Sequence, residues 1–129
     1  MRELSPGPDS NDSNPEYAVV NERGANVAGR VSVAGTSSAR RKGLSGLDAL
    51  AGGRGLWIAP CEAVHTFGMK FPIDVLFLDR ELCVRKIVTG LSRRRIAVCL
   101  SACSVLELDA GAILRSGTQV GDRLVFQRL

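Results

Sequence analysis

The residues best suited to chemistry lie within residues 56–79, a stretch dominated by apolar, strand-forming side chains. This stretch contains the only histidine, His65, and an aspartate, Asp74. An unpaired polar group among buried apolar side chains costs roughly 1–3 kcal/mol, so both groups need partners. We therefore predict that His65 and Asp74 meet each other, or share the guanidinium of Arg40 or Arg41, inside an apolar shell.

This constellation supports two interpretations in which Asp74 is buried, beside a third in which Asp74 faces water. In the first, Asp74 is an internal strut, because strand alternation places it on the same face as Leu76 and Leu78. Its carboxylate there needs a cation or several N–H donors. In the second, His65, Thr66, Asp74 and an arginine line a polar pocket for a small anionic or polyhydroxylated ligand.

A second pattern is the four-residue spacing of Cys61, His65 and Met69. In one helix or strand, side chains at this spacing share a face. A thiolate, an imidazole and a thioether form a soft ligand set that favours monovalent copper. The competing interpretation is core packing, because Pro60 and Gly68 interrupt a regular element and Cys and Met are common core residues.

Cys61 and His65 also match the residue types of a thiol-dependent enzyme. The cysteine would be the nucleophile and the histidine the base, with Asp74 orienting the imidazole. The sequence identifies no oxyanion hole for such a reaction. It therefore favours a non-catalytic protein and implies no cofactor.

The composition bounds the class of protein. A chain of 129 residues with 45% hydrophobic residues accommodates one globular domain. No apolar run reaches the roughly 20 residues of a membrane span, and the start of the chain lacks the apolar core of a signal peptide. We expect a cytoplasmic protein that does not enter a membrane. Its four cysteines are then thiols, and without a Cys-x-x-Cys pair they do not predict a zinc site.

The net charge of +4 is concentrated in two basic clusters, residues 40–42 and 93–95. Aromatic residues make up 5% of the chain and none interleaves with either cluster, so we do not expect nucleic-acid binding. For residues 93–95 we predict a solvated loop.

The elements that position these residues are short. Residues 1–15 are polar and predict a disordered tail, which leaves residues 16–129 as a single domain. After the tail we expect a bent ribbon over residues 56–79, five further strands (17–20, 30–34, 82–88, 104–108, 123–127) and short helices (37–42, one ending at 52–53, and one that Asp109 caps and Gly117 ends). In that last helix Ala110, Ile113 and Leu114 should share one apolar face. These elements predict a β-rich α+β domain, small and partly closed like a barrel, with two or three short helices.

Seven elements of the sequence, in this order, resemble one family of bacterial and archaeal proteins, the domain of unknown function number 192. They are Arg41-Lys-Gly-Leu44, Gly55-Leu-Trp-Ile-Ala-Pro-Cys61, Val64-His-Thr-Phe-Gly-Met69, Phe71-Pro-Ile-Asp-Val-Leu-Phe-Leu-Asp79, Val105-Leu-Glu-Leu108, Ala110-Gly111 and Val120-Gly-Asp122. The resemblance extends over residues 17–127 and implies a small barrel-like β fold with short helices. It implies no activity.

The chain departs from this family in two ways. Many relatives carry an export signal or a lipoprotein anchor, which this sequence does not show. Relatives often have a Pro-Trp-Arg element where this chain has Ser92-Arg-Arg-Arg95. A role placed in that loop therefore does not carry over from the family.

These observations lead to one functional hypothesis. The chain is a non-catalytic binding or accessory module with a polar pocket around His65, Thr66 and Asp74. Arg41 is the preferred arginine partner because it opens the Arg-x-Gly-Leu element. The thiol-dependent enzyme and the copper site remain the alternatives.

Overall fold

The computed structural model describes residues 15–36, 44 and 49–129. Within these residues the chain forms nine strands and one short helix. In chain order they are β1 (Tyr17–Val20), β2 (Asn26–Ala34), β3 (Arg54–Ile58), β4 (Ala63–His65), β5 (Ile73–Leu78), β6 (Val84–Leu91), β7 (Ile96–Val98), β8 (Ser104–Asp109), α3 (Ala112–Ser116) and β9 (Val125–Arg128).

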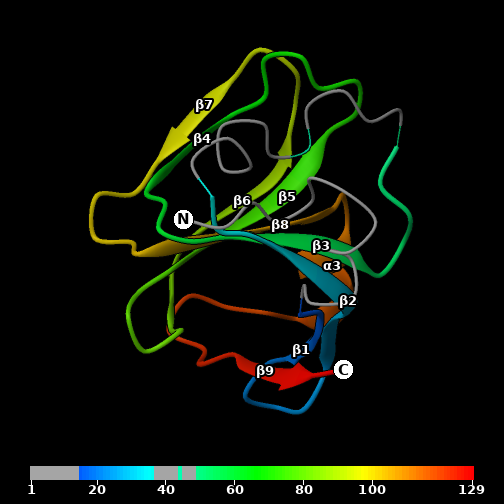
Figure 1. Ribbon diagram of the computed structural model, residues 1–129, viewed down its shortest axis with the longest axis vertical. Coiled ribbons are helices and arrows are strands. Elements are labelled where there is room, and N and C mark those ends of the chain that lie inside the picture. The colour runs from blue at the N-terminus through cyan, green and yellow to red at the C-terminus, as the bar shows by residue number, and fades with distance from the viewer. Residues whose placement is uncertain (1–14, 37–43, 45–48) are drawn as a thin grey trace.

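Seven strands form one mixed sheet in the order β6-β5-β8-β3-β2-β1-β9 (Figure 1). Strands β4 and β7 form a separate two-stranded sheet, which we call the outer ribbon. Only the β2–β3 pair is parallel among the described strands. The prediction of a β-rich fold is confirmed.

The strands of the described residues do not close into a barrel. The large sheet ends at β6 and β9. The segments at the start of these two strands meet at one isolated bridge, between Cys83 and Arg123, and at three backbone hydrogen bonds between residues 82–84 and 121–124, without forming a continuous ladder. Strand β9 has four residues, is largely exposed and pairs with β1. The sheet is therefore open.

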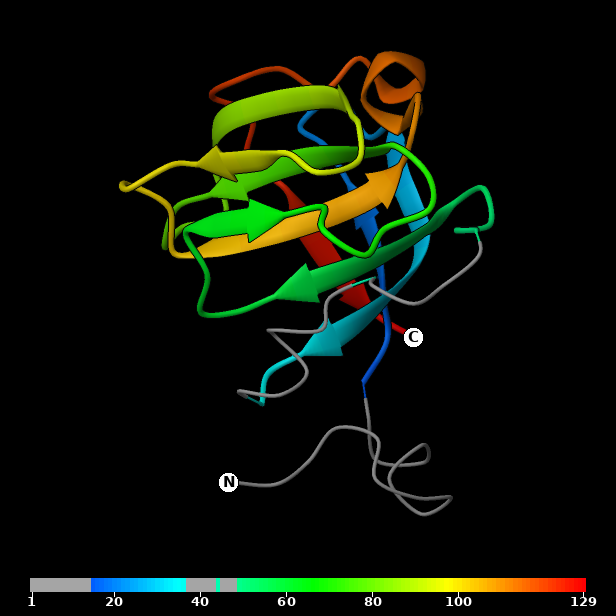
Figure 2. The ribbon, with the colours of Figure 1, turned by 90° about the horizontal axis from the view of Figure 1, so that it is seen from above.

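Two apolar clusters cover the two faces of the large sheet. The helix-side cluster contains Val19, Val27, Ala28, Val31, Leu76, Leu78, Val84, Leu106, Leu108, Ala112, Ile113 and Leu124, and the ribbon-side cluster contains Leu44, Val64, Met69, Ile73, Val75, Phe77, Leu91, Ala97, Ala102 and Val105. Alternate residues of β5 and β8 enter opposite clusters, as the period of a strand requires. Figure 2 shows the outer ribbon in front of β5 and β8, on the face that carries the ribbon-side cluster.

Two of the strand predictions differ from the observed fold. Strand β8 was predicted to be half-buried and is instead buried at every position, because it lies between β3 and β5 with both faces covered. Residues 89–101 were predicted only to cross the surface. They contain the end of β6 and all of β7.

The helix predictions fare less well. Residues 37–43 and 45–48, where two helices were expected to lie or begin, are outside the described residues. Asp109 does not cap α3, whose N-cap is Gly111 with φ of 96°. The buried residues of α3 are Ala112, Ile113 and Ser116, and Leu114 is 85% exposed. Of the predicted face Ile113 is buried as expected, but Ala110 and Leu114 are exposed, because the helix begins two residues later than the sequence pattern indicates.

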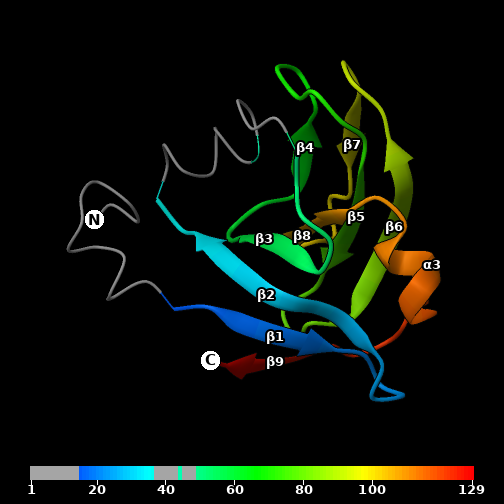
Figure 3. The ribbon, with the colours of Figure 1, turned by 90° about the vertical axis from the view of Figure 1, so that its right-hand side faces the viewer.

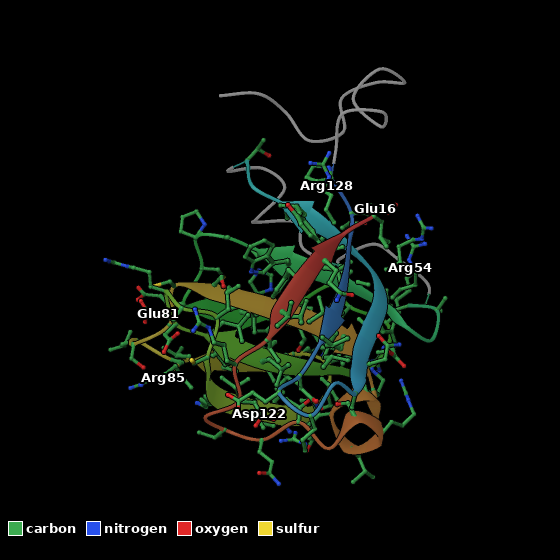
Figure 4. All side chains as sticks on the ribbon, turned by 90° about the horizontal axis from the view of Figure 1, so that it is seen from below. Glu16, Arg54, Glu81, Arg85, Asp122 and Arg128 are labelled. Atoms are coloured by element: carbon green, nitrogen blue, oxygen red, sulfur yellow. The ribbon has the colours of Figure 1, made fainter. Side chains whose placement is uncertain are left out.

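The two ends of the domain are joined in space. Strand β1 pairs with β9, and the β1–β2 turn contacts the segment after α3 through Asn21, whose amide donates to the Ser116 carbonyl at 2.9 Å. Figure 4 shows Glu16 near Arg54 at one end of these strands and Asp122 at the other. The chain's described ends therefore stabilise one edge of the same sheet.

Candidate functional site

Asp74 is the most deeply buried charged residue in the predicted constellation, with 1% of its surface exposed. Its Oδ1 accepts a hydrogen bond from the Gly90 N–H at 2.9 Å, and its Oδ2 accepts from the Gly111 and Ile113 N–H groups at 3.1 and 3.0 Å. Three backbone donors therefore satisfy the carboxylate, as the strut interpretation requires. They also hold the end of β6 and the first turn of α3 against β5.

His65 and Asp74 do not meet, so the predicted pair is wrong. Asp74 shares its face of β5 with Leu76 and Leu78, in the helix-side cluster. His65 ends β4 in the outer ribbon, which covers the opposite face, and its side chain points to solvent. The described residues give it no hydrogen bond or ion pair. Its ring lies 5.6 Å from the Phe67 ring at an angle of 38°.

The proposed arginine partners cannot be placed. Arg40 and Arg41 lie outside the described residues, so the part that the pocket hypothesis gives to Arg41 stays a prediction. The arginines that the structure does describe beside Thr66 are those that follow β6.

Thr66 connects the outer ribbon to the loop that follows β6. The Thr66 hydroxyl donates to the Ser92 carbonyl at 2.5 Å and accepts from the Arg95 N–H at 2.8 Å. The Thr66 N–H also donates to the Arg95 carbonyl at 2.9 Å. Because Thr66 is fully buried, these bonds fix the turn of residues 92–95, here called the arginine turn.

The arginine turn presents three adjacent guanidinium side chains. Arg93, Arg94 and Arg95 are all exposed, and within the described part of the chain none of their side chains makes an ion pair or hydrogen bond. Arg94 has φ of 60°, in the left-handed region. The neighbours of Thr66 in sequence, His65 and Phe67, are exposed too. Two rings and three positive charges therefore flank one buried threonine.

The outer face of the ribbon is otherwise apolar. Strand pairing aligns Ala63 with Val98 and His65 with Ile96. Val64 and Ala97, the middle residues of the two strands, point to the opposite face and are buried in the ribbon-side cluster. Ile96 is 64% exposed. The sequence did not reveal this juxtaposition because the two strands lie about thirty positions apart.

The structure separates the members of the Cys61, His65 and Met69 pattern. Met69 is buried in the ribbon-side cluster, whereas His65 points outward. The Cys61 thiol donates to the Ala63 carbonyl at 3.0 Å. No group of three or more Cys, His, Asp or Glu side chains suited to a metal occurs among the described residues. The chain turns between Cys61 and Met69 and does not continue as one strand. The four-residue spacing therefore does not put the three side chains on one face.

Glu107 is a polar group that sequence reasoning missed. It lies in β8 between Leu56 of β3 and Val75 of β5, is 4% exposed, and its Oε1 has no hydrogen-bond partner in the described structure. Burial raises the pKa of Glu107 to about 7. The sequence feature that could have revealed Glu107 is an acidic residue within the apolar run Val105-Leu-Glu-Leu108, whose apolar members are buried in a central strand.

The fold and these sites define a small, mostly β protein with an exposed basic turn and a buried, unpartnered acid. Its one described helix is too short to cross a membrane. A family model matches residues 18–126, and the chain belongs to that family, DUF192, described as uncharacterized ACR. No curated protein matches the sequence.

Two solved structures share the fold. A Sinorhizobium meliloti protein called a "putative transcription regulator" has a TM-score of 0.78 and 24% sequence identity, over 88% of this chain and 93% of its own. A protein of unknown function from Novosphingobium aromaticivorans has a TM-score of 0.71 and 21% identity, over 85% of this chain and 83% of its own. At these identities the likeness concerns the fold alone.

Proposed function

We propose that this chain is a non-catalytic binding module for a small phosphate-bearing ligand with a planar ring. The ligand binds at the arginine turn, beside His65 and Phe67. The observation that carries the proposal is the set of Thr66 hydrogen bonds, which hold the arginine turn against the strand end that presents both rings.

Charge supports an anionic ligand. Three adjacent guanidinium groups, which have no acidic partner among the described residues, repel one another and create a local positive potential that attracts anions. Arginine also matches a phosphate group geometrically, because its planar donors bind two oxygens at once. The ordered main chain of the turn lowers the entropy lost when a ligand binds.

The exposed rings support a planar group on the ligand. His65 and Phe67 lie 5.6 Å apart at the edge of the turn. A base that stacks on an exposed aromatic face gains roughly 1–3 kcal/mol. In this arrangement Thr66 and Asp74 do not touch the ligand. They are positioning residues, since Thr66 fixes the turn and Asp74 holds Gly90 at the end of β6.

Calorimetric titration tests the proposal with three probes: ATP, inorganic tripolyphosphate and adenosine. We expect ATP to bind more tightly than tripolyphosphate, and adenosine to bind most weakly. Raising the ionic strength from about 0.01 M to 0.15 M should weaken ATP binding, because screening acts on exposed charges. His65→Ala should weaken ATP binding and leave tripolyphosphate unchanged.

A matched pair of triple variants separates the site from overall charge. The site variant combines Arg93→Ala, Arg95→Ala and Arg94→Gly, where glycine accepts the left-handed φ. The control replaces three exposed arginines elsewhere by alanine and removes the same charge: Arg80, Arg85 and Arg123. We expect ATP affinity to fall at least about tenfold in the site variant only. Equal losses in both variants, or no ATP binding at low salt, would rule the proposal out.

A further inference from the structure

A second feature lies at the other end of the outer ribbon, where the turn after β3 meets the loop before β8. Pro60, Cys61 and Glu62 on one side and Ala102 and Cys103 on the other line a hollow of about 330 Å³. Two thiol-bearing residues from distant parts of the chain therefore share one small surface depression.

The main chains of these two cysteines are directly joined. The Cys61 N–H donates to the Cys103 carbonyl at 3.0 Å. Because the Cys61 nitrogen lies 3.0 Å from the Cys103 oxygen, bond lengths alone keep the two Cα atoms within roughly 7 Å of each other. A disulfide needs a Cα separation of roughly 4.4–6.8 Å, so the two main chains lie close to this range. The Cys103 N–H donates to the Leu78 carbonyl at 2.8 Å, which anchors this segment to the end of β5.

The two thiols differ in accessibility. Cys103 is exposed, whereas Cys61 is half-buried and its thiol donates to the Ala63 carbonyl at 3.0 Å. Cys99 is also half-buried and lies 3.4 Å from the Ser101 hydroxyl. Cys83 lies in the bridge to Arg123, away from the hollow. This ordering makes Cys103 the first thiol that a reagent in solution meets.

We propose that Cys61 and Cys103 form a dithiol modification site that reacts with a low-molecular-weight disulfide. The Cys103 thiolate, after losing its proton to solvent, attacks one sulfur of the reagent and releases the other half as a thiolate. The Cys61 thiolate then attacks the Cys103 sulfur of the mixed disulfide and releases the second half. The two protein thiols are oxidised to one disulfide, and the reagent is reduced to two thiols.

The disulfide joins the turn after β3 to the loop before β8 and covers one wall of the hollow. Forming it requires the Cys61 thiol to leave the Ala63 carbonyl and turn toward Cys103. The product therefore ties the outer ribbon's entry segment to the large sheet by a covalent bond.

The test treats the full-length protein with oxidised glutathione and follows it by intact mass and peptide mapping. We expect the wild type to lose two hydrogen atoms and to give a peptide linked through Cys61 and Cys103. Cys61→Ser should instead accumulate a glutathione adduct on Cys103. Cys83→Ser is the matched control and should give the same linked peptide as the wild type.

Three results would overturn the proposal. They are a stable glutathione adduct on Cys103 in the wild type, a linked peptide that contains Cys99 in place of Cys61, and no reaction at any thiol. The mapping of the wild-type protein decides among them even where a serine variant does not fold.

Discussion

At the scale of single residues, the Glu107 carboxyl is a buried acid whose Oε1 has no hydrogen-bond partner among the described residues. A charged carboxylate that is buried without a partner loses its hydration and gains nothing in exchange. The protonated form avoids much of that cost, which is why burial raises the pKa of Glu107 to about 7. The sheet tolerates this acid at neutral pH because part of the population holds a proton.

This pKa predicts a pH-dependent stability. Between the ordinary value of 4.5 and about 7, the native state binds a proton that the unfolded state has released. The stabilisation that comes from this proton is therefore complete below the ordinary pKa and is lost as the pH rises through the pKa of the folded state. The unfolding free energy should fall by up to about 3 kcal/mol across this window.

Urea unfolding of the wild type and of Glu107→Gln at a series of pH values measures this effect. The variant has no titrating carboxyl at position 107 but keeps a polar group there. The informative quantity is therefore the slope of the unfolding free energy against pH. We expect a flatter slope in the variant than in the wild type between pH 4.5 and 7. Identical slopes would show that Glu107 does not hold the proton.

The prediction for His65 and Asp74 shows what single residues reveal and what they do not. The apolar neighbours of Asp74 in sequence predicted that it needs a cation or several N–H donors, and the structure gives it three N–H groups. Their identity did not follow, since Gly90 and Gly111 lie 16 and 37 positions away. His65 was wrongly expected to be inside because the outer ribbon has one face in water.

At the scale of elements, Asp74 joins three of them. It lies in β5 and binds the end of β6 and the start of α3, a helix of five residues that has no side-chain cap of its own. Such a short helix is not stable alone and depends on contacts from the rest of the fold.

Replacing Asp74 by asparagine should therefore cost about 3 kcal/mol of unfolding free energy, because the amide has one acceptor oxygen and brings donors that face other donors. We also expect faster hydrogen exchange at the Ile113 amide. Asp79→Asn is the matched control: Asp79 accepts two backbone N–H bonds but is half-exposed, so its loss should cost less. Equal costs in the two variants would argue against the role of Asp74.

Thr66 links the outer ribbon to the arginine turn in the same way. Thr66→Val removes the hydroxyl and leaves the Arg95 N–H and the Ser92 carbonyl without this partner, so it should cost about 1–2 kcal/mol. Thr66→Ser keeps the hydroxyl and should cost less. Hydrogen exchange at the Arg95 amide reports the turn directly. An unchanged exchange rate in the valine variant would mean that the turn holds without Thr66.

The elements themselves were only partly predictable. β1 was placed at its observed ends, because it is an apolar run flanked by polar and turn-forming residues. β7 was missed because its three residues give no periodic signal. Its place depends on pairing with β4, which lies roughly thirty positions earlier. Local pattern reports on neighbours in sequence, whereas short strands in a sheet are stabilised by partners far along the chain.

At the scale of the whole molecule, the seven-stranded sheet separates two apolar clusters, and each proposed site lies on the outer ribbon's side. The helix side carries the structural contacts of Asp74 and of the joined ends. The ribbon side carries β4 and β7 (Figure 3), and the arginine turn and the thiol pair adjoin the ends of these two strands. The sequence did not predict which residues lie on which side of the sheet. That distribution depends on the parallel β2–β3 pair and on the order of the strands.

The ion pair between Arg23 and Asp122 joins the first turn of this fold to its last. The Arg23 guanidinium donates to both carboxylate oxygens, at 3.1 and 2.6 Å, and to the Gly117 carbonyl. The hydrogen bond from Arg23 holds the pKa of Asp122 below its ordinary value of 3.8, and the Gln119 N–H acts in the same direction. The same contact raises the pKa of Arg23.

The pKa of Asp122 is lower in the folded state than its ordinary value. The stabilisation from the ion pair is therefore present above the ordinary pKa and is lost as the pH falls through the folded-state pKa. Arg23→Ala should therefore move the pKa of Asp122 up towards 3.8 and move the acid unfolding midpoint to higher pH. Carbon-detected NMR titration of the Asp122 carboxyl measures the first effect, and fluorescence of Trp57 follows the second. Arg30→Ala, which removes an exposed pair with Glu16, should leave Asp122 unchanged. If both variants shifted Asp122 equally, its pKa would reflect the overall charge of the protein, not this joint between the two ends of the chain.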